Sequence, residues 1–86
     1  MPVVFTDRFT KKYAELSRQL HNRVDKALSL LDADFRYPGL HSHPLKGFPG
    51  IYEAYVDAKY RMTFTRSGDK FVMRNVDNHD ECLNNP

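Results

Sequence analysis

The sequence predicts a single small α+β domain. Two observations lead to this fold class: apolar residues recur at helical spacing from residue 9 to residue 31, and they alternate with polar residues from residue 51 to residue 65. A connection rich in proline and glycine separates the two patterns. The 86 residues are 41% hydrophobic and 28% charged, which suits one globular domain spanning 1–86.

The N-terminal part predicts a short strand followed by two helices. Val3-Val4-Phe5 is long enough for one brief strand, and Thr6-Asp7 supplies an N-cap with an acid in the first helical turn. The helical spacing that begins at Phe9 runs without a break to Leu31. One helix of that length would overhang so small a core. We therefore expect a helix hairpin broken near Ser17.

The C-terminal part predicts a three-stranded antiparallel meander. Residues 32–50 form a connection, and two alternating segments follow, at 51–57 and 60–65. A turn at Ser67-Gly68-Asp69 leads into a third strand at 70–76. In that strand either Phe71 and Met73 or Val72 and Val76 can face the core, and we favour the first pair. Residues 77–86 are polar and predict a turn with a short helical tail.

This layout places the helix hairpin on one face of the sheet. The predicted core consists of Phe9, Tyr13, Leu16, Leu28, Leu31, Tyr52, Val56, Tyr60, Met62 and Phe64. The opposite, uncovered face carries Glu53, Tyr55, Arg61 and Thr63. It also carries Arg74 if Phe71 and Met73 face the core, as we favour. Such a polar face is either solvated or a binding surface.

Charge and cysteine content narrow the function only slightly. The net charge of +2 does not identify a nucleic-acid binder. Between residues 44 and 76, however, the basic residues Lys46, Lys59, Arg61, Arg66, Lys70 and Arg74 outnumber the acidic residues Glu53, Asp57 and Asp69. That band is a footprint for a polyanion or an ordinary solvated face. The single cysteine, Cys82, and the lack of an apolar run long enough for a bilayer favour a cytoplasmic protein without a membrane partner.

Four sequence motifs, in order, resemble those of the RelE/ParE toxin superfamily. They are Phe9-Thr10-Lys11-Lys12-Tyr13-Ala14-Glu15-Leu16, His43-Pro44-Leu45-Lys46-Gly47, Tyr60-Arg61-Met62-Thr63-Phe64 and Arg74-Asn75-Val76-Asp77-Asn78-His79-Asp80-Glu81-Cys82-Leu83. The resemblance covers nearly the whole chain and is greatest to the YafQ-like branch of RelE-type ribonucleases. His43 and His79 match two histidines of that branch, but Tyr55 stands where it has a third histidine and Lys59 where it has an aspartate.

The resemblance implies the toxin of a type II toxin–antitoxin system, an endoribonuclease that cuts mRNA on the ribosome without a metal ion or other cofactor. Its implied catalytic residues are His79 and His43 for proton transfer, with Arg61 and Arg74 side by side to hold the phosphoryl oxygens. Lys46, Tyr55 and Lys59 are candidate RNA contacts. The implied partners are the ribosome with its mRNA and a cognate antitoxin, in a toxin–antitoxin heterotetramer.

Plainer interpretations stand beside these. His79 also suits a polar cap at a strand end, His43 a loop turn before Pro44, and the basic residues a solvated surface. His41-Ser42-His43 with Cys82 does not have the spacing of a zinc motif. Two other functions remain open: a ParE-like inhibitor of DNA gyrase, and a decayed homologue that only binds its antitoxin.

Overall fold

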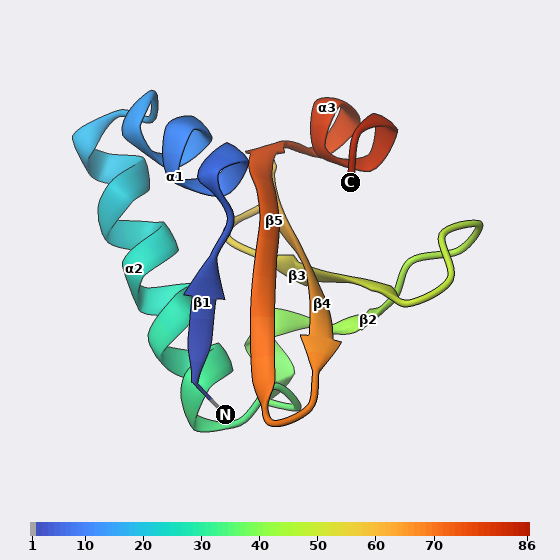
Figure 1. Cartoon of the computed structure of the whole chain (residues 1–86). Helices are drawn as coiled ribbons and strands as arrows, with labels where there is room; N and C mark the ends of the chain where they lie inside the picture. Colours follow the sequence, from blue (N-terminus) through green and yellow to red (C-terminus); the bar gives the residue numbers. More distant parts are fainter. Residues whose placement is uncertain (1) are drawn as a thin grey trace.

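A computed structural model describes residues 2–86 and confirms the α+β fold class (Figure 1). The elements in chain order are β1 (Val3–Phe5), α1 (Asp7–Ala14), α2 (Arg18–Ala33), a 3-10 turn η1 (Pro38–Leu40), β2 (His43–Pro44), β3 (Ile51–Tyr55), β4 (Tyr60–Ser67), β5 (Lys70–Asn78) and α3 (His79–Asn84). Within residues 2–86, every helix is too short or too polar to cross a membrane.

The predicted helix hairpin is confirmed, with its break at Ser17. The Thr6 hydroxyl caps α1 by accepting a hydrogen bond from the Phe9 N–H at 3.1 Å. The Ser17 hydroxyl caps α2 in the same way, accepting from the Leu20 N–H at 3.3 Å. Each cap satisfies an N–H group that has no partner inside its helix, which fixes where the helix begins.

The sheet has five strands in the order β1-β5-β4-β3-β2. The predicted meander β3-β4-β5 forms its centre, and a turn at Gly68, where φ is +60°, connects β4 to β5. β1 pairs with β5 in parallel, at the edge of the sheet. The connection predicted over 32–50 is not all loop, because it contains η1 and the two-residue strand β2, which pairs with β3.

The core lies between the helix hairpin and one face of the sheet, and it matches most of the prediction. Phe71 and Met73 are buried there, as predicted. Val76, which belongs to the pair of residues not expected to face the core, is buried there too. The cause is a β-bulge: Thr63 pairs with Asn75 while Phe64 pairs with Met73, so Arg74 is an extra residue in β5. Tyr60 lies outside the core, so its assignment was wrong.

The opposite face is not uncovered as predicted, because α3 packs against part of it (Figure 1). The Cys82 side chain is completely buried, and its thiol donates to the Arg61 carbonyl oxygen at 3.4 Å. The first N–H of α3, from His79, donates to the Lys59 carbonyl oxygen at 2.7 Å. This cover buries Thr63 and Asn75, which would otherwise face solvent.

Candidate functional site

One row of polar residues crosses four neighbouring strands on the face that α3 partly covers. His43 on β2 pairs with Glu53 on β3, Glu53 with Thr63 on β4, and Thr63 with Asn75 on β5. We call these four residues the polar row. Cross-strand partners lie within side-chain reach of each other, so the row forms one continuous surface.

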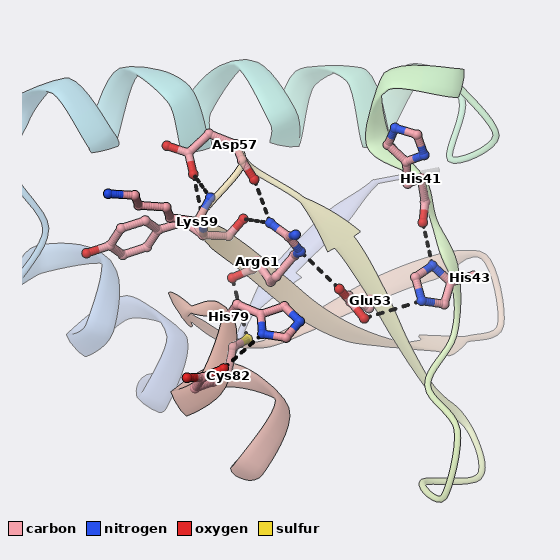
Figure 2. Close-up of polar contacts among 10 residues, drawn as sticks. His41, His43, Glu53, Asp57, Lys59, Arg61, His79 and Cys82 are labelled. Carbon is pink, nitrogen blue, oxygen red and sulfur yellow. Dashed lines mark hydrogen bonds and ion pairs between the residues drawn. The ribbon is translucent and has the colours of Figure 1, made fainter.

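Glu53 is the centre of the polar row, with only 4% of its surface exposed. Its Oε1 accepts from Arg61 Nε at 3.1 Å, and its Oε2 lies 3.3 Å from His43 Nε2 (Figure 2). Glu53 was predicted to lie on the polar sheet face but was not predicted as a site residue. The alternation of polar and apolar residues in the sequence could have predicted the ion pair, because it places Glu53 and Arg61 diagonally opposite each other on adjacent strands, on the same face of the sheet.

Arg61 is buried rather than presented to a ligand. Its Nη1 donates to the Asp57 and Tyr60 carbonyl oxygens at 2.5 and 3.1 Å. Arg61 pairs across the sheet with Asp77, whereas Arg74 is the bulge residue further along β5. The prediction that Arg61 and Arg74 lie side by side was therefore wrong, and the two arginines do not form one phosphate clamp.

His43 and Tyr55 complete the cluster around Arg61. His43 Nδ1 lies 2.6 Å from the His41 carbonyl oxygen, so both ring nitrogens face acceptors and only a protonated ring can donate to both. The Tyr55 ring lies 3.7 Å from the guanidinium carbon of Arg61 and 4.6 Å from the His41 ring. Cation–π and ring contacts thus already use the surface predicted to stack a base.

His79 is the first residue of α3, and its side chain is 52% exposed. Its Nδ1 lies 3.0 Å from the Asp80 carboxylate, and among residues 2–86 nothing forms a hydrogen bond or ion pair with its Nε2. Figure 2 shows the Arg61–Glu53 pair between His43 and His79. The Lys59 side chain is exposed, and its carbonyl oxygen accepts the His79 N–H, so the lysine begins beside His79. These two side chains are available to a ligand.

The remaining basic residues do not form a continuous band. Lys46 is exposed in the loop between β2 and β3. Arg66 packs against the Phe35 and Phe71 rings, which belong to the helix side of the sheet. Arg74 is half-buried, and its Nε and Nη2 each lie 3.4 Å from the Pro86 carbonyl oxygen.

Two observations concern nucleophiles and metals. Burial raises the pKa of the Cys82 thiol to about 11, so the thiolate form is scarce at neutral pH. In the part of the chain that the structure describes, no three His, Cys, Asp or Glu side chains converge in a way that could hold a metal ion.

Solved structures of toxins share this fold. No protein-family model matches the sequence, and no curated protein matches it significantly. YafQ from E. coli strain BL21(DE3) superimposes with a TM-score of 0.74 at 16% identity, covering 92% of this chain and 93% of that one. A RelB-RelE antitoxin-toxin complex from Methanococcus jannaschii gives 0.75 at 16% identity, covering 94% and 95%.

A third similar structure is a YoeB/ParE toxin from Agrobacterium tumefaciens. It superimposes with a TM-score of 0.73 at 16% identity, covering 92% of this chain and 99% of the toxin. The chain therefore has the fold of the RelE/ParE toxin superfamily.

Proposed function

We propose that this chain is the toxin of a type II toxin–antitoxin system and cuts ribosome-bound mRNA in the cytoplasm without a metal ion. The observation that supports it is the buried Arg61–Glu53 ion pair on the polar sheet face, with the partly exposed histidines His43 and His79 at its rim. Carboxylate and guanidinium are 6% and 8% exposed. A buried ion pair contributes little net stability compared with apolar residues of the same size, because desolvation offsets its attraction. A functional role explains why a small domain contains one.

His79 is the proposed proton-transfer residue. With its Nδ1–H donated to Asp80, the Nε2 lone pair is available to accept the proton of a ribose 2′-hydroxyl. The 2′-oxygen then bonds to phosphorus, the bond from phosphorus to the 5′-oxygen breaks, and the 5′-oxygen takes a proton. The products are a 2′,3′-cyclic phosphate and a free 5′-hydroxyl.

The other residues have supporting roles in this proposal. Lys59 is exposed and its backbone lies next to His79, but its side chain extends away from the histidine ring (Figure 2), so in this proposal it binds a neighbouring phosphate of the RNA. His43 assists from the loop side of the cluster, as the proton donor for the leaving group. Lys46 contacts the RNA further from the reaction, Tyr55 reaches it through its hydroxyl because its ring already contacts Arg61 and His41, and Arg74 binds a phosphate separately from Arg61.

A cognate antitoxin is the proposed partner. Two solved structures with this fold are antitoxin–toxin complexes, one of RelB with RelE and one of DinJ with YafQ. On this chain the edge strand β1 exposes Val4 and Phe5, and a groove of about 350 Å³ opens between Phe5 and Tyr13. An antitoxin segment that folds onto this edge would pair with its unpaired backbone groups. Co-expression that neither restores growth nor co-purifies the two chains would count against this partner.

The burial of Arg61 favours one alternative, a homologue that binds its antitoxin but cuts nothing. In that case the Arg61–Glu53–His43 cluster only holds β2 against the sheet. The alternative predicts no mRNA cleavage by the wild type.

The decisive test is the His79→Gln variant, expressed from a tight promoter while mRNA ends and gyrase-dependent DNA damage are mapped. Removing a proton-transfer group costs about 10²–10⁴-fold in rate, so we expect cleavage to fall by that factor while folding and antitoxin binding persist. Asn84→Ala, exposed at the other end of α3, is the matched control. EDTA, under conditions that keep the ribosome assembled, should leave wild-type cleavage unchanged.

If the His79→Gln variant cuts mRNA within a few-fold of the wild-type rate, His79 has a structural role and not a catalytic one. DNA damage without mRNA cleavage would replace the nuclease with a gyrase inhibitor. If the wild type neither cuts mRNA nor damages DNA, the chain is a homologue that only binds its antitoxin.

A further inference from the structure

A hollow on the polar face contains cations that take no part in the proposed proton transfers. It has a volume of about 430 Å³ and lies between α1, β5, the end of α3 and the loop before β3. Its charged lining consists of the cations Arg8, Lys12 and Arg74 and the carboxylates Asp77 and Glu81. Lys12 is neutralised by Asp77, with its Nζ 2.6 Å from the carboxylate. No side-chain carboxylate of residues 2–86 pairs with Arg8 or Arg74.

The two arginines instead hold the segment that follows α3. Arg8 Nη1 donates to the Pro86 carbonyl oxygen at 3.3 Å, and Arg74 donates to the same oxygen through Nε and Nη2, both at 3.4 Å. Arg8 also donates to the Asn85 carbonyl oxygen. The Asn75 amide donates to that second oxygen at 2.9 Å. Guanidinium groups from α1 and β5, far apart in sequence, thus converge on one oxygen.

These tail contacts use the arginines incompletely. Each guanidinium carries five N–H donors in a planar fork suited to the oxygens of a phosphate. The bonds to the Pro86 oxygen, at 3.3–3.4 Å, are longer than the usual range for N–H···O, whereas Arg8 holds the Asn85 carbonyl oxygen closely. Charge-assisted bonds to phosphate are shorter and stronger, so a phosphate group would bind Arg74, and the Arg8 nitrogen that it shares, better than the Pro86 oxygen does.

We propose that Arg8 and Arg74 form a subsite for a phosphate of single-stranded RNA, and that the tail Asn85–Pro86 occupies it until RNA displaces the tail. The choice of RNA comes from Phe48, which lines the same hollow and is 39% exposed. An exposed aromatic ring beside convergent cations is how proteins bind single strands, with the base stacked and the phosphate held. This inference rests on the proposed function for the identity of the ligand.

The tail then acts as a competitor within the chain. A tail that occupies the subsite about nine-tenths of the time lowers the apparent RNA affinity about tenfold. Removing the tail should also add one contact between the protein and an RNA phosphate. For a single strand, each such contact steepens the fall of log K with log[salt] by about 0.7.

The experiment compares the full chain with a chain that ends at Asn84, using a 2′-O-methyl RNA of about ten nucleotides, a length that one small domain can bind. This RNA cannot be cut, because the 2′-oxygen is blocked. We expect the shortened chain to bind it about tenfold more tightly, with a salt slope steeper by about 0.7. Arg74→Gln in the shortened chain should cancel both changes. Arg18→Gln, an exposed charge at the start of α2, is the matched control and should cancel neither.

Thermal melting checks that the shortened chain folds. If it does not, Pro86→Gly in the full chain loosens the tail and should change affinity in the same direction. Unchanged RNA affinity in the folded variant overturns the proposal, as does a gain that survives Arg74→Gln. If the shortened chain binds polyglutamate of similar length more tightly but RNA no more tightly, the proposal is wrong and the subsite binds an acidic peptide. Because binding needs no cleavage, a chain that behaves as expected here but never cuts mRNA contradicts the nuclease function alone.

Discussion

Replacing Glu53 by glutamine should destabilise the protein severely, although the two side chains have nearly the same shape. Glu53 is the counter-charge of Arg61 and is also within ion-pair distance of His43. In Glu53→Gln the amide oxygen can still accept from Arg61 Nε, so the geometry survives. The charge does not, and Arg61 becomes a buried cation whose remaining partners are carbonyl oxygens and the Tyr55 ring.

The expected loss follows from that burial. Breaking a buried ion pair by removing one partner costs about 3–5 kcal/mol of stability. Because Glu53→Gln retains hydrogen bonds to Arg61, we expect a loss at the low end of this range, about 3 kcal/mol. A domain of 86 residues has a free energy of unfolding of about 4–13 kcal/mol. The loss is therefore a large fraction of the total, and the Tm should fall by about 12–24 °C.

Thermal unfolding followed by circular dichroism at pH 7 measures this change. The double variant Glu53→Gln, Arg61→Met supplies the control, because it removes the stranded charge and leaves an apolar side chain of similar length. We expect it to recover most of the lost stability. A Glu53→Gln variant that melts within a few degrees of wild type, or a double variant no more stable than the single one, would refute the reasoning.

Two further predictions concern titratable groups. Burial raises the pKa of Asp57, but the N–H groups of Lys59 and Tyr60 and the Arg23 guanidinium outweigh it and hold that pKa below its ordinary value of 3.8. Asp57→Asn should therefore cost about 1 kcal/mol at pH 7, and urea titrations should show this difference shrinking as the pH falls through the lowered pKa; a difference that persists in acid would contradict the assignment. Alkylation of Cys82 by iodoacetamide at pH 8 should be about 10²-fold slower in the folded protein than in urea, and equal rates would mean that α3 does not stay packed on the sheet.

The sequence predicted the elements well because their causes are local. Thr6 and Ser17 cap helices through hydrogen bonds to residues three positions away, and the alternation after Ile51 follows from the pleat of a strand. The pairing of β1 with β5 could not be predicted in this way. Val3 and its partner Phe71 are distant in sequence, and nothing in a three-residue strand specifies its neighbour.

The candidate site was predicted less well for the same reason. His43 and His79 were identified by their motifs, but the bulge at Arg74 depends on how β5 fits against β4 and has no marker in the sequence. One extra residue in β5 is enough to separate Arg74 from Arg61. The burial of Arg61 depends on α3 and Glu53 together, which only the folded chain brings to one place.

The pairing of β1 with β5 also governs how a newly made chain can fold. β1 pairs with residues 71–73 of β5, so both helices and the strands between β1 and β5 are synthesised before β1 can pair. Helices α1 and α2 exist earlier, but the part of the sheet core that contains Phe71, Met73 and Val76 does not. Contacts this distant in sequence slow folding. During translation the apolar hairpin remains uncovered, and the polar face is assembled only after synthesis has passed β5.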